Sequence, residues 1–159
     1  MPKSDTPKLD DIDKKILRVL SDDGKISNKD LAEKVGLSPS PCWQRVQRLE
    51  KEGVITGYRT LLNQEMLGAP DVVFVVLTLE RHSGTSPEEM IDKLALLPEI
   101  LEIYLTSGSS DYLLKVAVDG TQGFEEFIRR KLHEVEGVSQ SRSSFSLQCF
   151  KQIENFLPE

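Results

Sequence analysis

Hydrophobic residues in the first part of the chain recur at steps of three and four, the spacing of an amphipathic helix. The first such run extends from Leu9 to about Gly24, and its apolar members are Leu9, Ile12, Ile16, Leu17, Val19 and Leu20. Asp10, Asp11 and Asp13 favour the N-terminal end of a helix, where the helix dipole is positive, and Gly24 ends it. We therefore predict a first helix over this run.

Two further helices are predicted directly after the first. Ser27 is a preferred N-cap residue for a short helix over Asn28–Val35, and Gly36 supplies the left-handed residue that ends it. Ser38 is then expected to cap a third helix over Pro39–Glu52, because proline is favoured in the first helical turn. A short helix, a glycine turn and a longer helix are typical of a helix-turn-helix.

The chain changes character after the third helix. Val54–Leu62 contains valine, isoleucine, threonine and tyrosine, which are enriched in strands, and predicts a small β wing or a linker strand. Asn63–Pro70 contains a glycine and a proline and is expected to be a linker between domains. Residues 1–8 contain two prolines and are expected to form a flexible arm. The first domain is therefore predicted over residues 9–62.

The second half alternates between strand-like and helix-like patterns. We predict strands over Val72–Glu80, Ile100–Thr106, Asp111–Val118 and Ser139–Phe150, helices over Ser86–Leu97 and Thr121–Glu134, a loop over His82–Ser86 and a turn over Ser107–Ser110. The order β-α-β-β-α-β is that of a ferredoxin-like fold, with both helices on one face of an antiparallel sheet. The fold class is therefore α+β, with this second domain over residues 71–151 and a tail over residues 152–159.

The first predicted strand is apolar on both faces. Side chains alternate along a strand, so its two faces carry Val73, Val75 and Leu77 on one side and Val72, Phe74 and Val76 on the other. An apolar sheet face that no helix covers calls for a partner. We therefore expect the chain to dimerise through this sheet.

The composition, with 38% hydrophobic and 29% charged residues, is that of a globular domain. The longest apolar run, Val72–Leu77, is far shorter than the roughly 20 residues of a membrane-spanning helix. The N-terminus lacks the apolar stretch of a signal peptide, so we expect a cytoplasmic protein that does not enter membranes. Cys42 and Cys149 are expected to be reduced and largely buried, with a cross-link or a redox sensor as the alternative.

The charge is unevenly distributed along the chain. Residues 1–62 contain 12 Lys/Arg and 10 Asp/Glu, whereas residues 63–159 contain 8 and 16, within a net charge of −6. Phosphate contacts depend on local positive charge, which is screened over roughly 10 Å at moderate salt. The first half is therefore the candidate nucleic-acid-binding half.

The third predicted helix has residue types that suit the major groove of DNA. Cys42, Val46 and Leu49 fall on one face at about 100° per residue and are expected to pack inward. The remaining surface carries Ser38, Ser40, Trp43, Gln44, Arg45, Gln47, Arg48 and Lys51. Arginine bonds a guanine edge and glutamine an adenine edge, whereas serine and lysine mostly contact phosphates. We therefore predict binding to double-stranded DNA.

Two alternatives accompany this prediction. The polar surface of the third helix is also what a solvated face of an ordinary three-helix domain has. Trp43 lies on a flank of that face, where an aromatic side chain packs against a neighbour at least as often as it contacts bases.

The segments that carry these features resemble the Lrp/AsnC family of regulators. They are LDDIDKKIL (9–17), GKISNKDLA (24–32), VGLSPSPC (35–42), RVQRLEKEGVITGY (45–58) and SGSSDYLL (107–114). The resemblance implies a bacterial or archaeal transcriptional regulator with an N-terminal winged helix-turn-helix. It also implies a ferredoxin-like domain that binds a small effector, usually an amino acid, at a subunit interface, and a homodimer that assembles further, often to an octamer.

The resemblance places the effector near the turn between the second and third strands. Gly108 would let backbone N–H groups approach a carboxylate, and Asp111 would pair with an α-ammonium group. Tyr104 and Thr106 would line the side-chain pocket. The alternative is that glycine and aspartate only build a β-turn. Ser109 stands where the family often has an acid, so the effector specificity departs from the common pattern.

The sequence contains no motif of an enzyme. A phosphate-binding Walker loop, a GxSxG motif and a metal-ligand cluster are all absent, and His82 and His133 are the only histidines. We therefore predict a protein that is not an enzyme and needs no cofactor. A sensor that does not bind DNA is the remaining alternative, and the residues that distinguish the two are Gln44, Gln47 and Arg48.

Overall fold

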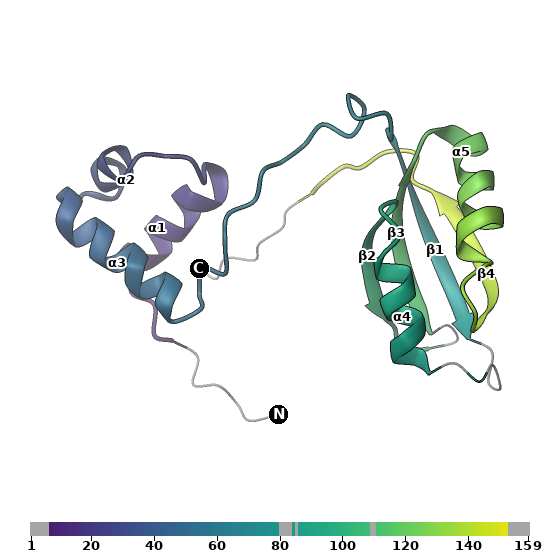
Figure 1. Cartoon of the computed structure of the whole chain (residues 1–159). Coiled ribbons are helices and arrows are strands. Elements are labelled where there is room, and N and C mark those ends of the chain that lie inside the picture. The colour runs from purple at the N-terminus through teal and green to yellow at the C-terminus, as the bar shows by residue number, and fades with distance from the viewer. Residues whose placement is uncertain (1–6, 80–83, 85, 109–110, 153–159) are drawn as a thin grey trace. The chain divides into compact units, whose positions relative to one another are not determined.

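The computed structural model describes residues 7–79, 84, 86–108 and 111–152. The chain divides into two compact units, with one boundary between Leu61 and Leu62 and the other between Phe150 and Lys151. Figure 1 shows the helical first unit and the second unit, which combines a sheet with helices. The predicted loop at His82–Ser86, the arm and the tail lie largely outside the described residues.

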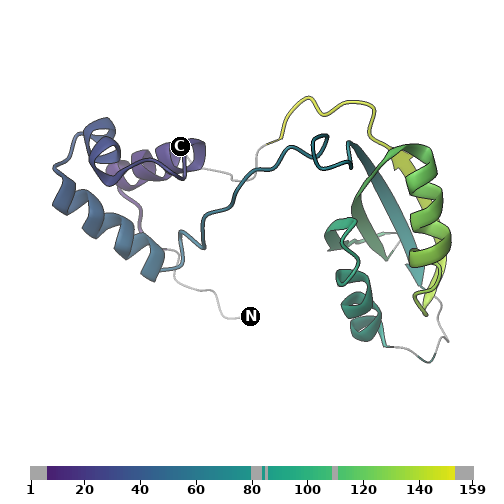
Figure 2. The same cartoon turned by 45° about the horizontal axis from the view of Figure 1, so that its top comes forward.

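The first unit contains three helices in the described residues, α1 (Asp11–Asp22), α2 (Asn28–Val35) and α3 (Pro39–Lys51). Figure 2 shows them packed around one another. Helix α1 begins after Asp10, which forms a reciprocal capping box with Asp13. Helix α2 is capped by the Ser27 side chain and ends at Gly36, whose φ of 77° is left-handed.

Ser38 occupies the N-cap position of α3, but its side chain forms no capping hydrogen bond. The predicted N-cap position of this serine is therefore confirmed, whereas its side chain adds no hydrogen bond to the helix. The start of α3 is held differently, by the Asn28 side chain of α2, whose Nδ2 donates to the Pro39 carbonyl oxygen over 2.9 Å. This bond joins the first turns of α2 and α3.

The core of the first unit lies between its helices. Its buried apolar members are Ile16, Leu31, Ala32, Val35, Cys42 and Leu49. Val46 is partly buried against this core. The three inward residues predicted for α3 are therefore confirmed.

The segment after α3 contains no strand within the described residues 52–70, so the predicted β wing or linker strand is wrong for this structure. The N–H groups of Val54 and Ile55 donate to the Leu49 carbonyl over 2.9 and 3.1 Å. These two donors therefore satisfy the C-terminal end of α3 instead of pairing with a strand. A strand also needs a neighbouring strand, and none forms in the described part of the first unit.

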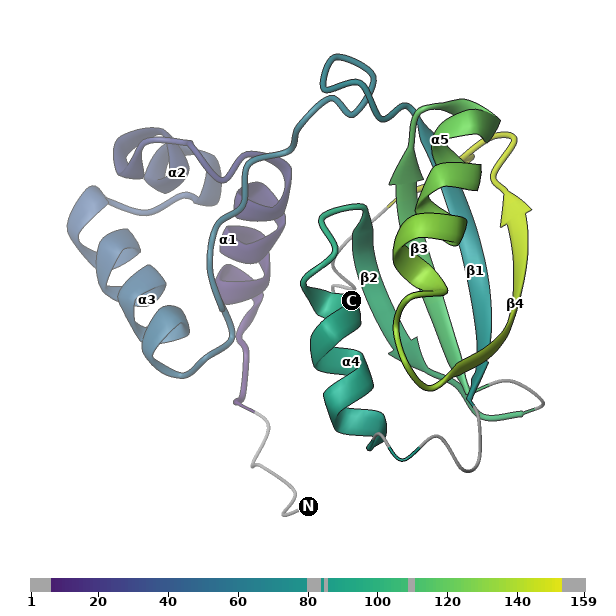
Figure 3. The ribbon, with the colours of Figure 1, turned by 45° about the vertical axis from the view of Figure 1, so that its right-hand side comes forward.

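The second unit has the predicted order of strands and helices. Its elements are β1 (Asp71–Leu79), α4 (Pro87–Ala95), β2 (Ile100–Leu105), β3 (Tyr112–Val118), α5 (Gly120–Phe127), the π-helix η1 (Ile128–Leu132) and β4 (Val138–Phe145). The described strands form an antiparallel sheet in the order β2-β3-β1-β4. Figure 3 shows α4 and α5 on the same face of this sheet. The ferredoxin-like fold is therefore confirmed.

The two faces of the sheet differ in burial. Val75 of β1 lies opposite Leu114 of β3, and both are fully buried beneath the helices. Phe74, which points the other way, is 39% exposed. The helix-free face therefore presents apolar side chains to solvent.

Most predicted ends in this unit lie within two residues of the observed ones, and the end of the last strand differs most. The second helix ends at Leu132 rather than Glu134, and its last residues are π-helical. The last strand ends at Phe145 rather than Phe150, because the N–H of Ser146 makes the final bond to the Val72 carbonyl and β1 begins at Asp71. Cys149 is therefore exposed, contrary to the expected burial, whereas Cys42 is buried as predicted.

Candidate nucleic-acid interface

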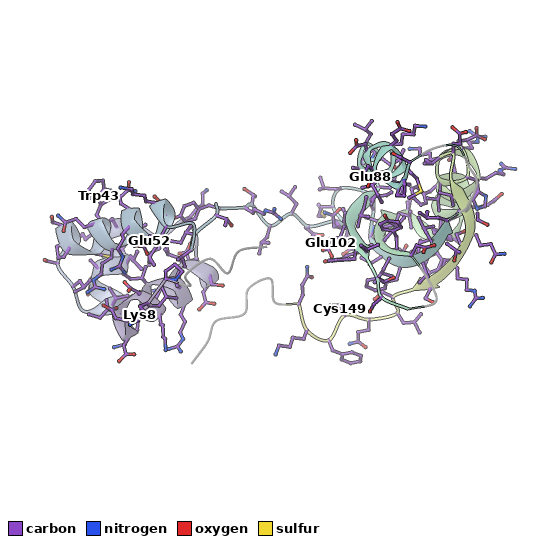
Figure 4. All side chains as sticks on the ribbon, turned by 90° about the horizontal axis from the view of Figure 1, so that it is seen from below. Lys8, Trp43, Glu52, Glu88, Glu102 and Cys149 are labelled. Carbon is purple, nitrogen blue, oxygen red and sulfur yellow. The ribbon has the colours of Figure 1, made fainter. Side chains whose placement is uncertain are left out.

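The outer face of α3 presents hydrogen-bonding side chains that point away from the other helices. Its exposed members are Ser40, Trp43, Gln44, Gln47 and Lys51, which we call the outer face. They span about a quarter to a third of the helix circumference at 100° per residue. Trp43 is 56% exposed, so most of its surface is open to solvent, and Figure 4 shows it on the outside of the helix.

The N-terminal end of α3 is polar and lacks acids. Ser38 and Ser40 are exposed, and no acidic residue lies in the first turn. Pro39 and Pro41 lack backbone N–H groups, so few donors remain for an anion at this helix end. The two serine hydroxyls are therefore the main donors that this end offers to a phosphate.

The flank of α3 that faces α1 is held by ion pairs. Arg45 Nη1 donates to Asp10 Oδ2 over 2.6 Å and to Asp13 Oδ1 over 2.8 Å. Arg48 Nη2 donates to Asp13 Oδ2 over 2.5 Å, and its Nε lies 3.9 Å from a Glu52 carboxylate oxygen. We call Asp10, Asp13, Arg45 and Arg48 the inner cluster.

The carboxylate at the centre of the inner cluster is buried. The Asp13 side chain is 1% exposed, whereas those of Arg45 and Arg48 are 28% and 42% exposed. The Asp13 backbone N–H and Arg45 hold the pKa of Asp10 at about 2, below its ordinary value of 3.8. Hydrogen bonds to Asp10 and Asp13 raise the pKa of Arg45.

The structure therefore places two predicted DNA contacts differently from the other six. Arg45 and Arg48 direct their guanidinium groups towards α1, whereas Ser38 and the members of the outer face do not. A helical wheel of α3 alone does not contain this information, because the partner belongs to another helix. The sequence did contain one sign of this pairing. Asp13 is an acid on the apolar stripe of α1, and a buried carboxylate there requires a partner.

A second polar cluster joins α3 to the segment that follows it. Glu50 accepts a hydrogen bond from Gln47 Nε2 over 2.7 Å and another from the Tyr58 hydroxyl over 2.9 Å. Partial burial and the neighbouring Glu50 carboxylate raise the pKa of Tyr58 to about 12. Tyr58 thus holds the residues after α3 against the helix in place of the predicted β wing, and sequence analysis did not single it out.

The predicted effector residues lie around the turn between β2 and β3. The Thr106 N–H donates to the Asp111 carbonyl over 2.9 Å, and Asp111 Oδ2 accepts from the Leu79 N–H over 2.7 Å. Gly108 has a φ of 139°, and a Cβ there would meet no atom within 4 Å, so its backbone is open. Ser109 and Ser110 lie outside the described residues. Asp111 therefore fastens this turn to the end of β1.

Tyr104 has a partner of its own on the helix-free face of the sheet. Its hydroxyl donates to Glu102, which also accepts from Lys115 Nζ over 2.9 Å. Both bonds lower the pKa of Glu102 and hold it ionised. Figure 4 labels Glu102 on β2, and the ion pair with Lys115 joins β2 to β3.

The described residues show no other candidate chemistry. No group of three or more His, Cys, Asp and Glu side chains in this part of the chain is arranged to hold a metal ion. Likewise, none of the described helices is long and apolar enough to cross a membrane.

Comparisons with known proteins agree with this arrangement. Residues 9–56 match the winged helix-turn-helix DNA-binding family, and residues 72–155 match the Lrp/AsnC ligand-binding domain. The leucine-responsive regulatory protein of Haemophilus influenzae is 46% identical over 157 residues, which cover 99% of this chain and 94% of that protein.

Solved structures are similar over nearly the whole chain. A transcriptional regulator from Neisseria meningitidis, in complex with L-Met, superposes with a TM-score of 0.88 at 32% identity, covering 94% of this chain and 96% of that one. The feast or famine regulatory protein of Mycobacterium tuberculosis, in complex with L-methionine, gives a TM-score of 0.83 at 31% identity, with coverages of 95% and 100%. This chain therefore belongs to the Lrp/AsnC family of DNA-binding transcriptional regulators, whose C-terminal domain binds amino-acid effectors.

Proposed function

We propose that this regulator contacts DNA bases through the outer face of α3 and responds to an amino acid that binds its C-terminal domain. The observation that carries the proposal is the outer face itself, where exposed hydrogen-bonding side chains, all uncharged except Lys51, project from a helix whose arginines pair with α1. The proposed contacts are Ser38, Ser40, Trp43, Gln44, Gln47 and Lys51. Arg45 and Arg48, which the sequence pattern included, are left out.

Each proposed contact has a chemical role. Gln44 and Gln47 offer the paired donor and acceptor that match an adenine edge in the major groove. Ser38, Ser40 and Lys51 fix the helix on phosphates, and Trp43 supplies an apolar surface for a thymine methyl group or a sugar. The base preference of the site therefore leans towards A·T pairs at the positions that the glutamines reach.

The DNA proposal is tested by selecting duplexes from a random library with the wild-type protein and measuring affinity by fluorescence anisotropy. Gln44→Ala should weaken binding to the selected duplex by roughly 5- to 100-fold, the effect of losing a bidentate base contact. Gln122→Ala, which changes an exposed glutamine of α5, is the matched control and should bind as the wild type does. Equal losses in both variants, or a loss in neither, would refute the assignment.

We propose that the effector is an amino acid with an apolar side chain, bound near Tyr104, Thr106, Gly108 and Asp111. Two structural relatives are complexes with L-methionine, and the relative from H. influenzae is a leucine-responsive regulator. The open backbone at Gly108 supports the proposal, because its conformation leaves room for a ligand carboxylate.

The effector proposal is tested by thermal shift with each of the twenty amino acids. We expect leucine or methionine to raise the melting temperature of the wild type, because a ligand that binds the folded state stabilises it. Asp111→Asn keeps an acceptor for the Leu79 N–H but removes the charge that would pair with an α-ammonium group. If the variant folds and keeps the full ligand-induced rise, Asp111 has only a structural role.

We also propose that the protein acts as a homodimer through the helix-free face of its sheet, with octamers built from dimers. The exposed Phe74 and the apolar side chains beside it support this interface. Analytical ultracentrifugation tests it, and a monomer at micromolar concentration would contradict it. We further propose a cytoplasmic regulator without catalytic activity, so a bound amino acid should be recovered chemically unchanged by mass spectrometry.

A further inference from the structure

The inner cluster contains a carboxylate where the helix pattern calls for an apolar residue. Asp13 lies between Leu9 and Ile16 on the inward stripe of α1 and is 1% exposed. Among the described residues it is the charged side chain that lies fully in the core. An apolar side chain would fill this place without the desolvation of a charge, so packing alone does not explain an aspartate here.

Asp13 acts on two arginines that lie one turn apart on α3. Its Oδ1 accepts from Arg45 over 2.8 Å and its Oδ2 from Arg48 over 2.5 Å, while the Asp10 N–H donates to Oδ2 over 3.1 Å. Two bonds to successive turns of the same helix restrain its rotation about its own axis. They also direct both guanidinium groups away from the outer face.

We infer that Asp13 is a positioning residue for DNA recognition, which sets the rotation of α3 and withholds Arg45 and Arg48 from the DNA phosphates. The inference rests on the proposed function, because it requires the outer face of α3 to be the surface that meets the bases. Asp13, a buried residue of α1, would thus affect sequence selectivity without contacting DNA itself.

The reason that such a restraint favours selectivity lies in how non-specific binding arises. Each phosphate contact releases counterions and adds affinity for any sequence, with a slope of about 0.9 in log K against log salt concentration. Two freed arginines on the flank of the reading helix would add such contacts without reading a base. When Asp13 holds both arginines, Lys51 is the one charged member of the outer face, and the uncharged members Ser40, Trp43, Gln44 and Gln47 decide where the protein binds.

The test compares Asp13→Asn with Glu52→Gln in the full-length protein. Both variants remove one negative charge beside Arg48, but Glu52 is 41% exposed and lies 3.9 Å from Arg48, so its loss frees neither guanidinium from Asp13. Affinities for the selected duplex and for a random-sequence duplex are measured over a series of salt concentrations. Circular dichroism verifies that each variant is folded at the assay temperature.

We expect Asp13→Asn to bind random duplex more tightly, with a salt slope steeper by about 1 to 2 per protomer, and to lose selectivity. Glu52→Gln should change the slope by less than half as much. A carboxylate with only a structural role would instead lower the melting temperature and leave the salt slope unchanged. Equal slopes for the two variants overturn the inference.

A second variant keeps the inference testable if Asp13→Asn does not fold. Arg48→Gln leaves Arg45 on Asp13, and its slope on random duplex should equal that of the wild type, because the withheld arginine contributes no phosphate contact. A slope that falls by about 1 overturns the inference. If the wild type itself binds no duplex, the proposed function fails, and the inference that rests on it fails with it.

Discussion

The two sides of α3 differ in what their polar side chains bind. On the inner side, Arg45 and Arg48 are tied to Asp13 over 2.8 and 2.5 Å. On the outer side, Gln44 and Trp43 are exposed and directed to solvent. The strongest phosphate-binding residue type thus lies on the side that faces the protein. Residue type alone does not identify a DNA-contacting surface, because the neighbouring helix decides which donors are available.

This difference also separates stability from recognition. The inner cluster lies against the core, so its loss should unfold the domain more easily. The side chains of the outer face are exposed, so removing them should leave the stability of the fold unchanged. Substitutions on the two sides are therefore expected to affect different measurements.

The largest expected effect comes from removing both arginines of the inner cluster. Arg45→Ala combined with Arg48→Ala leaves the Asp13 carboxylate buried without a cation, and breaking a buried pair in this way destabilises strongly. We expect a loss of about 3 kcal/mol in the free energy of unfolding, the low end of the usual cost, because water can enter from the exposed side of Arg48. Urea denaturation followed by circular dichroism measures it.

The matched control is the double variant Gln44→Ala, Gln47→Ala on the outer face. It removes two side chains from the same helix and should leave the free energy of unfolding within about 0.5 kcal/mol of the wild type. Similar losses for the two double variants would remove the distinction between the two sides.

A smaller effect is expected from Tyr58→Phe, which removes the hydrogen bond to Glu50 beside the outer face. The tyrosine is 51% exposed, so the loss should be about 0.5 kcal/mol at neutral pH. Because the folded state raises the pKa of Tyr58 to about 12, this contribution is fully present below pH 10.0 and is lost as the pH rises through 12. Thermal melts of both proteins from pH 8 to 12 should converge, and a constant difference would show that the phenol proton is not involved.

The smallest effect concerns Asp10 at the edge of the inner cluster. Its pKa is lowered to about 2 in the folded state, so its stabilising contribution is present above its ordinary pKa of 3.8 and is lost as the pH falls through about 2. Asp10→Asn should therefore melt below the wild type at pH 6, and the two melting curves should approach each other between pH 4 and 2. An acid transition that is identical in both proteins would rule out this role of Asp10.

Sequence patterns predicted the elements that local rules determine. Apolar spacing placed Cys42 and Leu49 in the core, and Ser27 and Gly36 marked the two ends of α2, because caps and periodicity act within a few residues. The alternation of strand and helix likewise predicted the ferredoxin-like sheet.

The main differences between the sequence predictions and the structure involve partners that are distant in sequence. Val54–Leu62 has strand-like residues, but no strand in the described part of the first unit pairs with it. The alternation of apolar and polar residues continues to Cys149, but β1 begins at Asp71. The residues of the predicted last strand after Ser146 therefore have no part of β1 to pair with. The sequence pattern also did not show that Arg48, which suits a guanine edge, donates a hydrogen bond to a carboxylate of α1, 35 residues earlier. Each outcome depends on which segments meet in space.

The most direct test of the account compares Gln47→Ala with Arg48→Ala, neighbours on one helix that lie on different sides. The two measurements are the affinity for the selected duplex and the melting temperature. We expect Gln47→Ala to bind this duplex roughly tenfold or more weakly, with an unchanged melting temperature. Arg48→Ala should melt at a lower temperature and lose less affinity than Gln47→Ala. The account is contradicted if Gln47→Ala binds like the wild type and Arg48→Ala loses affinity at an unchanged melting temperature.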